Sequence, residues 1–201
     1  ELGELHDEDL RVDDHRALAR LLASRPSNTL ALIAVPRRTL AENLATALRT
    51  GTTTTDDSDA ITVFRAQHFH SGVQLAERNI RALDFQRGNC EILVTTKGYG
   101  EGVDHTVPPI SLIVHFAQIT SIFDYVQQIG RGGRDGSVCR CIAMLNSKDM
   151  RDVAWLTESV TDVDHARHVH DAFHRLQAFV RSSRCRWFEI GQVFVQQAFS
   201  G

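Results

Sequence analysis

The chain has 201 residues, of which 42% are hydrophobic and 23% are charged, and its formal net charge is −3. This is the composition of a globular protein with a sizeable core, and its four cysteines, none in a C-x-x-C pair, exclude a disulfide-rich scaffold. No apolar run approaches the roughly 20 residues of a membrane helix, so we expect no membrane partner.

The charge is uneven along the chain, because residues 1–14 contain seven acidic side chains and one basic one. We expect this acidic leader to be flexible. The chain opens with Glu rather than Met, which indicates a fragment or a mis-bounded gene model, and it shows no signal peptide, so we expect that it is not secreted. We expect a nuclear location if the source is eukaryotic and a cytoplasmic one otherwise.

Hydrophobic periodicity predicts alternating strands and helices. In chain order we expect a helix at 14–24, a buried strand at 29–35, a helix at 39–49, a polar loop at 50–59, a short strand at 61–64, a loop, a helix at 73–87, buried strands at 91–95 and 111–116, a helix at 121–129, a strand at 138–145, and helices after 147.

This alternation predicts an α/β fold, in which a parallel sheet carries helices on both faces. We assign the sheet to a domain at 15–146 and a short all-helical appendage to 147–201. Ligands of such sheets gather beyond the carboxyl ends of the strands. We therefore expect the glycine-rich, charged segments to lie at that edge. We also expect Cys139 and Cys141, on one face of a strand, to be buried thiols.

The segment QQIGRGGRDG at 127–136 is the strongest candidate for chemistry. Its glycines allow a close approach of the backbone to a ligand, and Arg131 and Arg134 offer planar forks suited to phosphate oxygens. An arginine–glycine surface turn is the alternative reading. The segment resembles helicase motif VI of RecQ-type superfamily 2 helicases. The resemblance implies that Arg134 is an arginine finger, that Gly130 and Arg131 also meet ATP, and that Gln127 links the ATP and DNA sites.

A second segment, VTTKGYGEGVDH at 94–105, directly follows a predicted strand. Backbone N–H groups and a hydroxyl in a short loop suit a phosphate. The segment resembles motif V of the same family, although Lys97 and Glu101 depart from the pattern. The resemblance implies that Thr96 holds a DNA phosphate and that Gly102 and Asp104 belong to the ATP site. A plain strand-to-helix turn is the alternative.

Two further segments follow the family order. The stretch 31–48 resembles motif IV, with Arg37 and Arg38 at a strand end, and FHSG at 69–72 resembles the family's Y-H-A-G. The resemblance implies DNA contacts by Arg37, Arg38 and His70. After the sheet, RCRWFEIGQVF resembles the start of the family's zinc-binding module, with Cys185 as its first ligand. We expect Zn²⁺ only in a longer chain that supplies the other ligands.

The sequence contains no G-x-x-x-x-G-K-[ST] phosphate loop and no D-E-x-H box. In the RecQ-type family both belong to the first of two RecA-like lobes, so the resemblance implies that this chain is the second lobe of an ATP-dependent 3′-to-5′ DNA helicase. ATP and Mg²⁺ would be shared with the first lobe, single-stranded or forked DNA would be the partner, and the chain alone would be inactive. The alternatives are an RNA helicase, a duplex translocase, or a non-catalytic remnant that binds DNA or protein.

Overall fold

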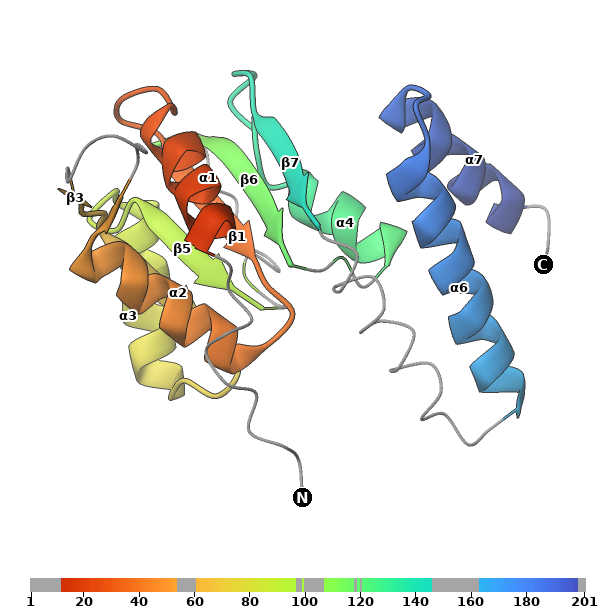
Figure 1. The fold of residues 1–201 in the computed structure, drawn as a ribbon, viewed down its shortest axis with the longest axis horizontal. Helices are drawn as coiled ribbons and strands as arrows, with labels where there is room; N and C mark the ends of the chain where they lie inside the picture. Colours follow the sequence, from red (N-terminus) through yellow and green to blue (C-terminus); the bar gives the residue numbers. More distant parts are fainter. Residues whose placement is uncertain are drawn as a thin grey trace.

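The computed structural model describes residues 12–53, 61–96, 99, 107–117, 119, 121–145 and 163–198. Its centre is a five-stranded, wholly parallel sheet (Figure 1). The strand order is β4 (Ala66–Phe69), β5 (Ile92–Thr95), β1 (Leu30–Ala34), β6 (Ile110–Phe116) and β7 (Arg140–Met144). Strands β1, β5 and β6 are buried along their whole length, as their continuous apolar runs predict.

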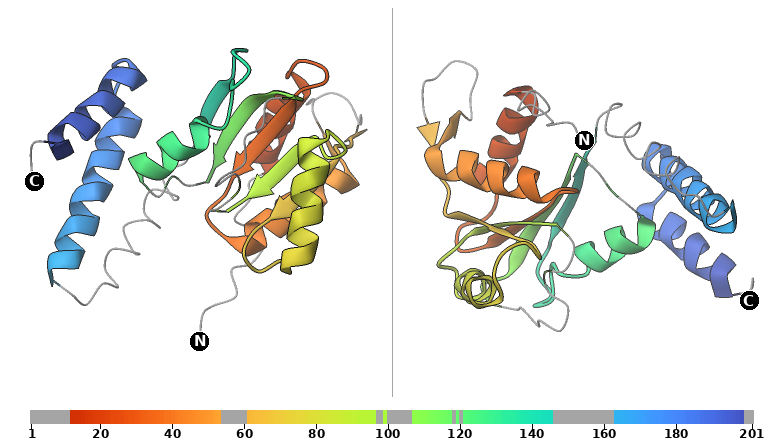
Figure 2. Two further views of the ribbon diagram at one scale, coloured as in Figure 1. Left: turned by 180° about the vertical axis from the view of Figure 1, so that it is seen from behind. Right: turned by 90° about the horizontal axis from the view of Figure 1, so that it is seen from below.

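Helices cover both faces of this sheet (Figure 2). Helices α1 (Val12–Ala23) and α2 (Arg38–Thr50) pack on one face, where Leu22 and Leu44 join Ile33 and Val94 in a core. Helix α3 (Leu75–Gln86) packs on the other face, where Phe85 meets Leu32 and other side chains. The predicted α/β architecture is therefore confirmed.

Three local expectations are wrong. Strand β3 (Ile61–Thr62) is not in the main sheet but pairs antiparallel with β2 (Thr52–Thr53), which we placed in a polar loop. Strand β4, which we read as a loop, forms an edge of the main sheet. Its polar side chains gave no apolar pattern from which a strand could be predicted. Cys139 is only partly buried and Cys141 is exposed, because β7 is the opposite edge strand.

A third cluster of apolar side chains forms beside the sheet. Helix α4 (Ile122–Ile129) contributes Ile122 and Tyr125, while α6 (Val163–Arg181) and α7 (Arg186–Ala198) contribute Leu176, Phe179 and Ile190. The helical appendage thus packs against α4 (Figure 1). In the described part of the chain, no helix combines the length and apolar character needed to cross a membrane.

Candidate nucleotide and nucleic-acid site

Three residues predicted to contact DNA gather at the carboxyl edge of the sheet. Arg38 follows β1, His70 follows β4 and Thr96 follows β5, and these three strands are neighbours. The N–H of Thr96 donates to the carbonyl of Phe69 at 3.3 Å, which fixes the end of β5 against the end of β4. Parallel strands that end together therefore bring these residues together, as the sequence predicts.

Side-chain contacts hold the loop after β4 to the start of α2. A guanidinium nitrogen of Arg38 donates to the hydroxyl of Ser71 at 2.9 Å. Glycine at position 72 leaves room for this contact, because a Cβ there would lie 3.0 Å from Nδ1 of His70 and 3.4 Å from Cδ of Arg38. Arg37, at the N-cap of α2, and Arg38 are both exposed, so both can reach a ligand phosphate.

His70 does not suit the direct DNA contact that the resemblance implied. Its side chain is only 3% exposed, and its Nε2 lies 2.9 Å from Oε1 of Glu42. Its Nδ1 accepts a hydrogen bond from the N–H of Gly72 at 3.2 Å. Burial and these contacts make His70 a support for the loop at 70–72, with Arg37 and Arg38 as the exposed groups.

The glycine–arginine segment does not lie where we expected. It follows α4, which runs back from the carboxyl edge, and the N–H of Gly133 donates to the carbonyl of Ile110, the first residue of β6, at 3.3 Å. A segment between a helix and the next parallel strand must return toward the amino ends of the strands. The segment therefore runs along β6 toward the start of β7, away from the carboxyl edge.

The segment is tightly packed on the sheet. A Cβ at Gly132 would lie 2.2 Å from Sγ of Cys139 and 3.1 Å from Cδ1 of Ile113, so only glycine fits there. Gly133 has a φ of 64°, in the left-handed region that glycine favours. Arg134 is exposed, and its Nε donates to the carbonyl of Gly130 at 3.1 Å. The glycines thus allow the backbone to pack closely against the sheet. The guanidinium groups of Arg131 and Arg134 have the donor geometry that phosphate oxygens require.

Tyr99 connects the two groups of predicted site residues, and sequence reasoning missed it. Its ring packs edge-on against Phe69, with centroids 5.3 Å apart, and against Phe85, at 5.4 Å. Burial raises the pKa of Tyr99 to about 12. Tyr99 shares an apolar cluster with Cys139, whose side chain lies against Gly132, so it is linked to both the end of β4 and the glycine–arginine segment. An aromatic residue inside a glycine-rich motif was the available signal.

The remaining predicted residues have different outcomes. Gly102 and Asp104 lie outside the described residues, so their part in an ATP site stays a prediction. Gln127 is exposed on α4. Cys185 is exposed at the start of α7, and within the described ranges the clustered His, Cys, Asp and Glu side chains suited to a metal are Glu42, His68 and His70 instead. The zinc role of Cys185 stays a prediction.

A hollow of about 800 Å³ lies at the opposite end of the sheet from Arg38 and Thr96. Its lining includes Leu30, at the start of β1, together with Arg65, Arg87 and Glu91. It contains none of the predicted site residues.

Comparisons with known proteins identify the family of the chain. The family described as "Helicase conserved C-terminal domain" matches residues 14–136. The chain is 27% identical over 127 residues to "ATP-dependent helicase wrn-1" of Caenorhabditis elegans and 29% identical over 124 residues to "ATP-dependent DNA helicase RecQ" of Haemophilus influenzae. These alignments cover 63% and 60% of this chain but only 12% and 19% of the relatives.

The fold also resembles that of a solved structure. The "C-terminal domain of the DEAD-box protein Dbp5" superposes with a TM-score of 0.50 at 20% identity, over 75% of this chain and 81% of that one. At this identity the likeness concerns the fold alone. The sequence relatives confirm the resemblance to RecQ-type helicases that the motifs indicated. The chain belongs to the helicase conserved C-terminal domain family.

Proposed function

We propose that this chain is the second motor lobe of an ATP-dependent 3′-to-5′ DNA helicase. The observation that supports the proposal is that two sets of residues suited to phosphate lie at different places on one sheet. Arg37, Arg38 and Thr96 lie at its carboxyl edge, and Arg131 and Arg134 project from a segment along β6. Two separate sets suit a protein that holds a nucleic-acid strand and a nucleotide at once.

The nucleotide site is shared between two lobes in this proposal. The first lobe holds the phosphates and Mg²⁺, and closure of the cleft brings Arg134 and Arg131 to the γ-phosphoryl oxygens. Charge spreads over these oxygens in the transition state, and arginines placed there supply about 10³–10⁵ in rate. Gly132 and Gly133 keep the arginine-bearing backbone seated against the sheet, so the guanidinium groups are positioned before closure.

Coupling between nucleotide and strand would pass through Tyr99. Its ring contacts Phe69, next to the His70 loop, and it shares an apolar cluster with Cys139, whose side chain lies against Gly132. A shift of the glycine–arginine segment on closure would therefore reach the loop that Arg38 and Ser71 hold together. Tyr99 acts here as a positioning residue, since it meets neither ligand directly.

The decisive experiment replaces Arg134 in a polypeptide that also carries a first lobe. We expect Arg134→Ala to lower kcat by about 10³-fold, roughly 4 kcal/mol, and to leave nucleotide binding nearly unchanged. Lysine should rescue poorly, because a point charge does not reproduce the guanidinium fork. Steady-state ATPase with and without single-stranded DNA, beside fluorescent-nucleotide binding, measures both quantities.

Arg140→Ala is the matched control, since Arg140 is an exposed arginine on the neighbouring strand β7. It should leave kcat unchanged. A normal kcat in Arg134→Ala would mean that 127–136 is only a surface turn. Stimulation by RNA instead of DNA would favour the RNA-helicase alternative, and ATPase activity of the 201-residue chain alone, lost in Arg134→Ala, would contradict the shared site.

A further inference from the structure

A group of three metal-binding side chains lies away from the predicted ATP site. Glu42 on α2 and His68 and His70 at β4 each offer one ligand atom, and these atoms all lie within 4.8 Å of one another. His68 and His70 are two residues apart, so both point to the α2 face of the edge strand. Their rings are stacked, with centroids 5.2 Å apart.

One imidazole nitrogen of this group is unsatisfied. Nδ1 of His68 is buried and has no hydrogen-bond partner, and Nε2 of His70 is buried with the Glu42 carboxylate beside it, 2.9 Å from Oε1. Buried polar atoms in native proteins nearly always have a partner, so the His68 nitrogen requires an explanation. A cation bound by His68, His70 and the Glu42 carboxylate would provide one.

We propose that Glu42, His68 and His70 bind a divalent transition-metal ion of the Zn²⁺ class. Two imidazoles and one carboxylate form a ligand set that such ions accept, with the fourth position left to water. Ligand atoms about 2.0–2.1 Å from a tetrahedral ion lie roughly 3.4 Å apart. The separations here, up to 4.8 Å within the group and 2.9 Å between His70 and Glu42, must therefore adjust to that value. The Glu42 side chain is 48% exposed and is free to make that movement.

Metal binding would change the tautomer of His70. Coordination through Nε2 of His70 moves the ring proton to Nδ1. The 3.2 Å hydrogen bond from the N–H of Gly72 is then given up.

Neighbouring arginines limit the affinity. Arg81 donates to the carbonyl of His68 at 2.8 Å, and Arg49 donates to the carbonyl of Ala66 at 3.3 Å. Both positive charges oppose a cation near β4, so we expect micromolar rather than nanomolar binding. The ion would fasten the edge strand to α2, beside the Arg38–Ser71 contact.

Titration of the 201-residue chain with Co²⁺, read from its visible d–d absorption, tests the proposal, with Zn²⁺ competition as a second readout. We expect one ion per chain and at least a tenfold weaker Kd in His68→Gln and in Glu42→Gln. Two controls remove rival ligands. His174→Gln changes an exposed histidine of α6, and Cys139→Ser with Cys141→Ser removes the thiols of β7. Both should bind as the wild type does.

Thermal melts without metal establish that each variant is folded. Glu42→Gln changes a half-exposed side chain and keeps the test decisive if His68→Gln is unstable. The proposal fails if the wild type binds no Co²⁺ at millimolar concentration, if both site variants bind normally, if a thiolate charge-transfer band accompanies binding, or if His174→Gln abolishes it.

Discussion

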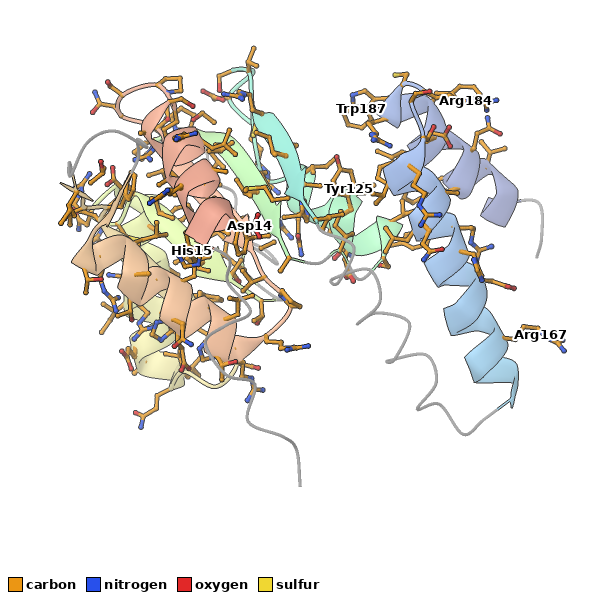
Figure 3. The ribbon with its side chains drawn as sticks, in the orientation of Figure 1. Asp14, His15, Tyr125, Arg167, Arg184 and Trp187 are labelled. Carbon is orange, nitrogen blue, oxygen red and sulfur yellow. The ribbon has the colours of Figure 1, made fainter. Side chains whose placement is uncertain are left out.

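The sheet and the helix pair α6–α7 differ in how completely their apolar side chains are buried. Strands β1, β5 and β6 are enclosed by helices on both faces, and their core is complete without α6 or α7. The helix pair has Leu176, Phe179 and Ile190 as its described buried residues. Its Trp187 is 71% exposed (Figure 3). The sheet therefore has a core of its own, whereas the pair depends on a neighbour.

That neighbour is α4, which belongs to both regions. The ring of Tyr125 packs against Phe179 with centroids 5.3 Å apart, and the ring of Phe123 packs against Phe194 at 5.2 Å. Helix α4 also carries Gln127 and leads directly into the glycine–arginine segment. We therefore expect a change in α6–α7 to reach the predicted arginines through α4 while the sheet stays intact.

Core truncations in the two regions should destabilise different parts of the molecule. Ile33→Ala removes a fully buried side chain between α2 and the sheet and should cost about 2–5 kcal/mol of global stability. Leu176→Ala, equally buried, should instead release α6 and α7 and leave the sheet protected. Denaturant unfolding with hydrogen exchange measures both. Equal loss of protection in β1 from the two variants would show that the regions form one cooperative unit.

Acid should weaken the junction between the sheet and α4. His115 on β6 packs against Tyr125, with ring centroids 4.9 Å apart, and burial lowers its pKa to about 4 while the Gln128 side chain acts to raise it. Between pH 6.5 and 4 the unfolded chain binds the proton and the folded one does not, so stability falls as pH falls. The loss between pH 7 and pH 5 is about 2 kcal/mol.

His115→Phe removes this titration and keeps an apolar ring beside Tyr125. Urea unfolding gives the free energy of unfolding at pH 7 and at pH 5. The decrease between these two pH values should be about 2 kcal/mol smaller in the variant than in the wild type. His68, whose pKa burial also lowers to about 4, contributes with the same sign, and His68→Gln serves to subtract it. An unchanged difference in His115→Phe would place the acid sensitivity elsewhere.

Sequence reasoning predicted the parts of the fold that rest on continuous apolar runs. The runs at 29–35, 91–95 and 111–116 became β1, β5 and β6 because both faces of a central parallel strand must be apolar. Strand β4 was missed because an edge strand tolerates polar residues such as Gln67 and His68. The same tolerance left Cys141 exposed on β7.

The sequence patterns named candidate residues but could not predict how these residues are arranged. Motif patterns pointed to Arg131, Arg134, Arg38 and Thr96, yet the path of α4 back along the sheet decided where the arginines lie. Glu42 and His68 are distant in sequence and meet only because α2 packs on β4. Such long-range contacts produce no local sequence pattern, so they can be identified only from the folded structure.

The smallest predicted effect concerns the start of α4. The hydroxyl of Ser121 accepts a hydrogen bond from the N–H of Asp124 at 3.0 Å and so caps the helix. Ser121→Ala leaves that N–H without its partner and should cost about 1 kcal/mol, or roughly 2–4 °C in Tm.

If α4 joins the two regions, the loss should appear first as faster hydrogen exchange at residues 122–125 and in α6, with β1 and β5 unaffected. Ser121→Asn restores a capping oxygen and should recover most of the stability, because asparagine ranks with serine at this position. A loss of protection confined to 122–125 in Ser121→Ala would show that α6–α7 holds together without a firm α4. In that case a change in α6–α7 would not be transmitted through α4 to Arg131 and Arg134.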